Sequence, residues 1–136
     1  MENFRRELHG DDADDPTVDR LNSMRRDYSA AVDALRKLER ELDRTLDRIA
    51  EEHDAAAACS RRHNMALRAG HQETAAVAAR FSQRHQQRAA VLQQKAEALE
   101  AEQDILKREL TEMKLAITAL DGGTCGHQGE IITGGP

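Results

Sequence analysis

The stretch Arg68-Ala69-Gly70-His71 decides the fold, because heptad repeats on its two sides mirror each other. Large residues recur every seven positions on both sides, and we predict that they pair across a seam between two helices. The predicted seam residues are Leu21, Tyr28, Leu35, Leu42, Ile49, Leu92, Leu99, Leu106, Met113 and Leu120. If the helices are antiparallel, the residue numbers of every pair, from 21 with 120 to 49 with 92, sum to 141. The sequence therefore predicts a hairpin turn at Gly70 and His71, where glycine readily takes the left-handed conformation that ends helices.

Helical periodicity on both sides of the turn predicts an all-α fold, a long antiparallel two-helix coiled-coil hairpin over residues 16–120. Asp15-Pro16 is a favourable helix start, since aspartate is a good N-cap and proline suits the first helical position. Gly122-Gly123 is expected to end the second helix. The predicted order is a polar lead-in 1–15, a helix 16–69, a turn 70–71, a helix 72–120 and a disordered Gly-rich tail 121–136.

The composition is that of a coiled coil. Charged residues make up 33% of the 136 residues, aromatic residues only 2%, and tryptophan is absent, a bias typical of long helices. Two helices bury a seam but cannot enclose a thick core, so we expect a homo-oligomer, as a dimer or a larger helical bundle. No apolar run is long enough to span a membrane and the N-terminus lacks a signal-peptide core, which predicts a cytoplasmic protein.

Residue size varies along the predicted seam. Large residues such as Leu21 and Leu120 occupy the open end, whereas alanines are frequent near the turn, in 55–58 and 75–79. Because small residues bury less apolar area, the turn end is expected to be the less stable one.

The net charge of −5 conceals a strong asymmetry along the hairpin. Residues 55–95, around the turn, contain seven basic residues and one acid, Glu73, for a net charge of +6, so the rest of the chain carries −11. Three interpretations are open: a solvated end without a partner, staggered self-assembly of basic ends on acidic arms, or an anionic partner such as lipid headgroups. Nucleic acid is the least favoured anion, because aromatic residues for base stacking are lacking apart from Phe81. The candidate contact residues are Arg61, Arg62, Arg68, Arg80, Arg84 and Arg88.

No catalytic constellation is present in the sequence. Neither a nucleophile–base pair nor a phosphate-binding loop occurs, so we expect no enzyme activity, no cofactor and no small-molecule substrate. Cys59 and His63 are spaced to share a helix face, near His85, but we interpret them as small polar seam residues and not as metal ligands. Cys125 and His127 resemble the first half of a zinc ribbon. Because the second half is missing, we expect no metal site there either.

Two motifs resemble phage-shock protein A and its plastid relative, the vesicle-inducing protein in plastids. Ala13-Asp14-Asp15-Pro16 is similar to the Glu-Asp-Pro that opens the long hairpin of that family. The stretch from Met65 to Arg80 is similar to the hairpin tip of the family, where the pattern is Ala-x-x-Ala-Leu-x-x-Gly-x-Glu-x-Leu-Ala-x-x-Ala. The interval between the motifs also agrees, and the resemblance extends over residues 16–120.

This resemblance implies a non-catalytic scaffold of the envelope or membrane stress response that self-assembles into rings or rods. It would be cytoplasmic and peripheral at the inner face of the membrane. Two departures change that expectation. The short, acidic segment Met1 to Asp12 stands where the family has an amphipathic membrane helix, and the family's further helices do not follow Leu120. We therefore expect a scaffold or adaptor, or a regulator of a full-length relative, whose partner would be an anionic lipid or a membrane-associated protein. The alternative is a coiled-coil oligomer or regulator with no membrane contact.

A further alternative is a factor that enters the secondary channel of RNA polymerase. Such factors also combine a coiled-coil hairpin with a cysteine-bearing segment. They need acidic residues at the hairpin tip to hold magnesium, and a complete four-ligand zinc site. Here the tip is basic, with Glu73 as its one acid, and the zinc half-site is incomplete, so this alternative is the least favoured.

Overall fold

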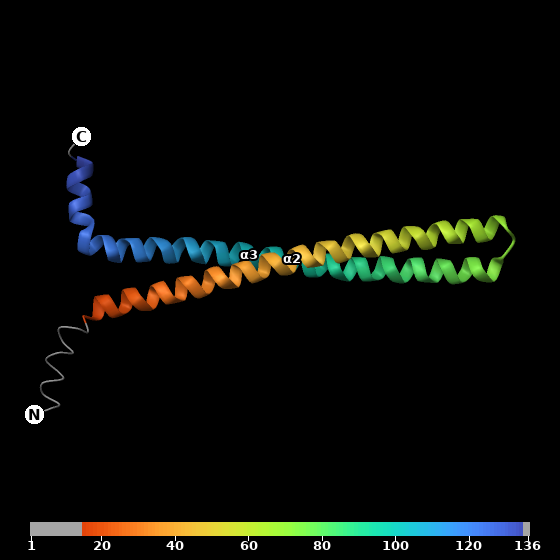
Figure 1. The fold of residues 1–136 in the computed structure, drawn as a ribbon, viewed down its shortest axis with the longest axis horizontal. Coiled ribbons are helices and arrows are strands. Elements are labelled where there is room, and N and C mark those ends of the chain that lie inside the picture. The colour runs from red at the N-terminus through yellow and green to blue at the C-terminus, as the bar shows by residue number, and fades with distance from the viewer. Residues whose placement is uncertain (1–14, 135–136) are drawn as a thin grey trace, which may run out of the picture. The chain divides into compact units, whose positions relative to one another are not determined.

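The protein consists of two long helices joined by a short turn. The computed structural model describes residues 15–134, with side chains described as far as Gly122. Helix α2 is Pro16–Arg68 and helix α3 is Gln72–Gly134, and no strand occurs within the described range. The two helices pack against each other as an antiparallel hairpin, joined at the turn drawn in green in Figure 1. The predicted all-α fold class is confirmed.

Helix α2 begins at the Asp-Pro pair. The Asp15 carboxylate oxygen Oδ1 accepts a hydrogen bond from the backbone N–H of Thr17 at 3.1 Å, and the Asp15 carbonyl accepts one from Asp19 N–H at 3.0 Å. Asp15 is therefore the N-cap, and Pro16, which has no N–H to leave unpaired, is the first helical residue.

The turn is a Schellman motif built around Gly70. Gly70 has a φ of 80°, and its N–H donates to the carbonyl of Leu67 at 3.1 Å. The N–H of His71 donates to the carbonyl of Ala66 at 2.8 Å, and the carbonyl of His71 accepts the first hydrogen bond of α3, from Ala75. These bonds satisfy the last carbonyls of α2 while the chain reverses direction. The reversal lies at the residues that the mirrored heptads indicate.

The C-terminal end of α3 differs from the sequence expectation. The second helix was expected to end at Leu120 and to be followed by a disordered segment 121–136, but α3 continues to Gly134. Gly122 is helical, without the positive φ that a glycine helix stop requires. Glycine lowers helix propensity by about 1 kcal/mol but removes no backbone hydrogen bond, and the next proline is Pro136.

Two compact units are distinguished along the hairpin. Unit 1 combines Met1–Leu35 with Ile105–Pro136, and unit 2 is Arg36–Asp104. In unit 1 an exposed ion pair joins the two helices, with Arg25 Nη2 at 3.3 Å from Asp121 Oδ2. Both side chains are about half exposed, so water screens this pair and its contribution to stability is small. The predicted seam residues of unit 1 are all partly buried: Leu21, Tyr28, Leu35, Leu106, Met113 and Leu120.

The buried core lies in unit 2. Ile49, Leu92 and Ala96 form its cluster, Leu42 packs against them, and Leu99 is also buried. The predicted partners 49 and 92 thus belong to one cluster. All residues that are buried among the described ones lie in unit 2, although many are only alanine, serine or threonine. Small side chains let the helix backbones approach closely, so the buried residues lie in the unit that contains the turn. The lower stability expected for the turn end stays a prediction, because small side chains bury little apolar area.

Substituting the turn glycine should destabilise the hairpin. In Gly70→Ala the new Cβ meets nothing within 4 Å, so the cost comes from the left-handed backbone alone, about 1–2 kcal/mol. Gly122→Ala is the matched control, because its Cβ also meets nothing within 4 Å but the backbone is helical. That variant should gain up to about 1 kcal/mol. Urea unfolding followed by circular dichroism measures both, and effects of the same sign would contradict this account.

Truncating the core cluster should cost far more than truncating an exposed leucine. Ile49 is 8% exposed and Leu46, on the same helix, is 47% exposed. Ile49→Ala should lower the free energy of unfolding by about 2–3 kcal/mol, and Leu46→Ala by about 0.5 kcal/mol or less. Thermal unfolding at one fixed protein concentration checks this, and equal losses would show that the seam is not where we place it.

Candidate functional site

The arginines near the turn occupy two kinds of position relative to the seam. Burial on α2 and α3 follows a heptad: on α2 Ile49 and Ala56 occupy position a and Thr45, Cys59 and Ala66 position d, and on α3 Ala75, Ala89 and Ala96 occupy position a and Leu92 and Leu99 position d. Positions a and d therefore face the other helix, g and c form one flank, e and b form the opposite flank, and f points away from the seam. The candidates on the g and c flank are Arg62, Arg84 and Arg88. The candidates at f are Arg61, Arg68 and Arg80. All six are exposed, but they do not form one site.

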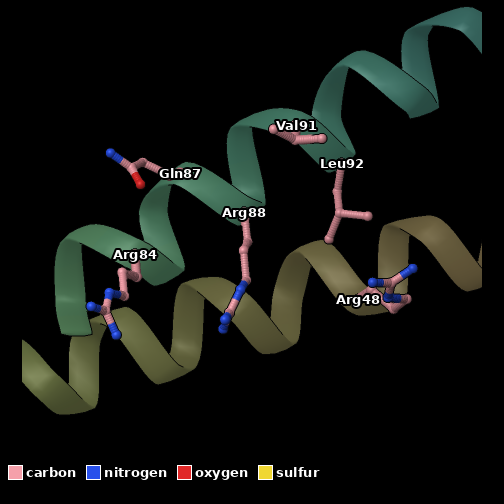
Figure 2. Close-up of a pocket in the computed structure, with 6 residues that line it drawn as sticks. All are labelled: Arg48, Arg84, Gln87, Arg88, Val91 and Leu92. Carbon is pink, nitrogen blue, oxygen red and sulfur yellow. The ribbon is translucent and has the colours of Figure 1, made fainter.

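A groove of about 410 Å³ runs along the g and c flank and contains three arginines. Arg48 comes from α2, whereas the other lining residues come from α3: Arg84, Gln87, Arg88, Val91 and Leu92. Figure 2 shows Arg88 and Leu92 extending from α3 toward α2, with Arg48 on α2. Leu92 is buried and Val91 is 64% exposed, so the groove offers an apolar surface beside guanidinium groups.

A second groove, of about 340 Å³, lies on the same flank closer to the turn. Its lining includes Arg62 from α2 and Val77, Phe81 and His85 from α3. The guanidinium of Arg84 lies 5.2 Å from the centroid of the Phe81 ring, a cation–π contact that links this groove to the first. We call the g and c positions of residues 36–104 the basic flank. Its centre is lined by Arg48, Arg62, Val77, Phe81, Arg84, Arg88 and Val91.

The sequence prediction included three of the seven residues that line the centre of the basic flank. It named Arg62, Arg84 and Arg88, but it omitted Arg48 and noted Phe81 only as the one aromatic residue near the basic stretch. The overlooked signal is the shared heptad phase, since Arg48 falls at g, as do Phe81 and Arg88, and Val91 falls at c. Selecting basic residues by their nearness in sequence also includes Arg61, which lies at position f and points away from the seam and the basic flank.

A polar layer crosses the seam near the turn. The hydroxyls of Ser60 and Ser82 are 3.0 Å apart, and Ser82 Oγ donates to the carbonyl of Ala56 at 3.1 Å. His63 Nδ1 donates to the carbonyl of Ala75 at 2.8 Å. Each of these bonds joins α2 to α3. The layer gives the buried Ser82 and the partly buried Ser60 and His63 hydrogen-bond partners, and it favours one register of the two helices.

Cys59, His63 and His85, which lie close together in the sequence-based hairpin, do not line one groove. Cys59 is buried beside the groove that contains His85, whereas His63 lines a groove of about 320 Å³ on the opposite flank. His85 Nδ1 lies 2.6 Å from Glu52 Oε1, so that imidazole has a partner of its own. The part of the chain described by the structure holds no group of three His, Cys, Asp or Glu residues placed to bind a metal. Cys125 and His127 lie beyond the described side chains.

The grooves are open surfaces that offer cations and apolar contact. Arginine guanidinium groups can donate several hydrogen bonds to phosphate or carboxylate oxygens, which makes an anionic partner the chemistry that the basic flank fits. No helix within residues 15–134 has an apolar stretch long enough to cross a membrane.

Comparisons with protein-family models, with curated proteins and with solved structures find no match. The resemblance to phage-shock protein A is therefore a hypothesis that rests on the two sequence motifs.

Proposed function

We propose that this chain is a non-catalytic coiled-coil scaffold or adaptor that binds an anionic membrane surface through the basic flank. The observation that carries the proposal is the combination of cations and exposed apolar side chains on one flank. Arg62, Arg84 and Arg88 present guanidinium groups, and Phe81 and Val91 beside them are 46% and 64% exposed. Guanidinium groups bind lipid phosphates, and apolar side chains next to them can enter the boundary between headgroups and acyl chains.

The expected binding is reversible and peripheral. Each basic residue near an anionic membrane surface contributes about 1 kcal/mol, so the three arginines together contribute about 3 kcal/mol at low salt. That is enough to attract the hairpin to a charged surface and too little to anchor it permanently. Salt should weaken the binding, because exposed charges are screened over about 10 Å at moderate ionic strength.

The resemblance to the hairpin of phage-shock protein A supports a role in envelope or membrane stress, at the cytoplasmic face of the membrane. Support comes from Asp15-Pro16 at the helix start and from the stretch 65–80 around the turn. Those residues form the N-cap and the Schellman turn of the hairpin.

The second candidate function is a coiled-coil oligomer or regulator without membrane contact. It is favoured by one observation: the flank opposite the basic flank carries acids, among them Glu97 and Glu100, both exposed. A surface with cations on one flank and acids on the other can satisfy its charges by packing against copies of itself.

Liposome co-sedimentation tests the membrane proposal. Changing Arg62, Arg84 and Arg88 together to alanine should reduce binding to anionic vesicles at low salt by about 100-fold, because about 3 kcal/mol of attraction is removed. The matched variant changes Arg61, Arg68 and Arg80, the same number of charges at position f, and should bind nearly as well as the wild type.

Vesicles of neutral phosphatidylcholine are the lipid control and should bind none of the three proteins. If the wild type fails to bind anionic vesicles at low salt, the membrane role is wrong and the coiled-coil oligomer is the better description. Equal losses in the two triple variants would mean that net charge, and not the basic flank, attracts the protein.

A further inference from the structure

Charge is divided between the two flanks of unit 2. Seven basic residues on the basic flank outnumber three acids, for a net charge of +4: Lys37, Arg44, Arg48, Arg62, Arg84, Arg88 and Lys95 against Glu41, Glu51 and Glu102. The e and b positions of residues 36–104, which we call the acidic flank, carry −4: Glu39, Asp43, Glu97, Glu100 and Asp104 against Arg36. All five acids of the acidic flank are exposed.

The structure supports this division into flanks. Lys95 and Glu41, both at g, come together across the seam, with Nζ at 3.4 Å from Oε2. Ser60 on α2 and Gln86 on α3, both at e, line one groove on the opposite side. Residues of like heptad letter from α2 and α3 therefore share a flank, as expected for antiparallel helices, and the two flanks face in opposite directions.

We propose that the basic flank of one chain docks on the acidic flank of a second copy. The net charges of the two flanks are equal and opposite, so their contact neutralises both. The basic flank also exposes Phe81 and Val91, and the acidic flank exposes Leu46, so apolar contact accompanies the ion pairs. Charged groups fix which surfaces meet, while the apolar side chains contribute affinity.

This contact is heterologous and leaves the assembly open. Because the two flanks lie on opposite sides of unit 2, docking one pair leaves one basic flank and one acidic flank free. A third copy can then bind by the same contact, and growth continues sideways without a built-in stop. A two-fold symmetric dimer would not need flanks of opposite charge.

The charges also set a stagger between neighbours. The arginines of the grooves, such as Arg84 and Arg88, lie closer to the turn than the acids Glu97 and Glu100. With a rise of about 1.5 Å per residue, bringing the centres of the two groups together offsets parallel neighbours by roughly 20 Å along the helix axis.

The inference goes beyond the proposed scaffold function, because it assigns the surfaces through which copies join. It also makes membrane and second copy competitors for Arg84 and Arg88. The test below contains no lipid, so its failure leaves the liposome result untouched, and a failure of membrane binding leaves this interface standing.

Two charge-reversal variants and their mixture test the interface by light scattering coupled to size exclusion. The wild type at low salt should reach masses several times that of the salt-dissociated species, in multiples of the 15.2 kDa chain. Arg84→Glu with Arg88→Glu reverses two charges on the basic flank and cancels its net positive charge. Glu97→Lys with Glu100→Lys does the same for the net negative charge of the acidic flank. Each variant alone should keep the mass that the wild type shows at high salt. In an equimolar mixture the intact basic flank of one variant can dock on the intact acidic flank of the other, and the two reversed flanks are also opposite in charge. The mixture should therefore reach at least twice that mass.

Matched controls reverse the same number of charges at position f. Arg61→Glu with Arg80→Glu, and Asp47→Lys with Asp54→Lys, should assemble at low salt to at least half the wild-type mass. Recovery of mass on mixing also shows that the flank variants are folded. The proposal is overturned if either flank variant assembles like the wild type, if the mixture stays at the mass of its parts, or if the f controls dissociate as fully as the flank variants.

Discussion

The close approach of α2 and α3 at small seam residues is the constraint on which the rest of the structure depends. Ala56 and Ala66 on one helix and Ala75 and Ala96 on the other are all at most 7% exposed, so the backbones of unit 2 leave little room for water. Once these residues face each other, every other heptad position has its direction fixed. The division of charge between two flanks follows from the seam, since no residue outside it can move to the other side without breaking the packing.

The turn and the seam could be predicted from the sequence because both obey a simple period. Mirrored heptads have one centre, and the glycine at that centre, Gly70, supplies the positive φ that a Schellman motif needs. Ile49 and Leu92 share a cluster for the same reason, because pairing across an antiparallel seam is a matter of counting. Depth of burial was harder to predict, since it depends on how closely two backbones approach and not on the size of each side chain.

The residues of the basic flank could be predicted only in part, because residues that are neighbours in sequence can lie on different faces of a helix. Arg61 and Arg62 are neighbours in the chain, yet a helix turns about 100° between them and sends them to different surfaces. Arg48 escaped notice because it lies outside the basic stretch, although its heptad phase brings it to the same groove as Arg88. The end of α3 differs from the prediction for another reason. Glycine lowers the stability of a helix without preventing it, so Gly122 and Gly123 weaken α3 but do not end it.

Gly70 also governs whether the seam forms within one chain or between two. Its left-handed backbone interrupts what would otherwise be an uninterrupted helical sequence from Pro16 onward. If residues 69–71 all took helical angles, α2 would run directly into α3, and each half would find its partner in another molecule. The seam contacts would be identical in this domain-swapped pair, so packing alone cannot choose between the two forms. The three residues of the turn, with Gly70 at their centre, therefore separate a hairpin closed within one chain from a domain-swapped dimer.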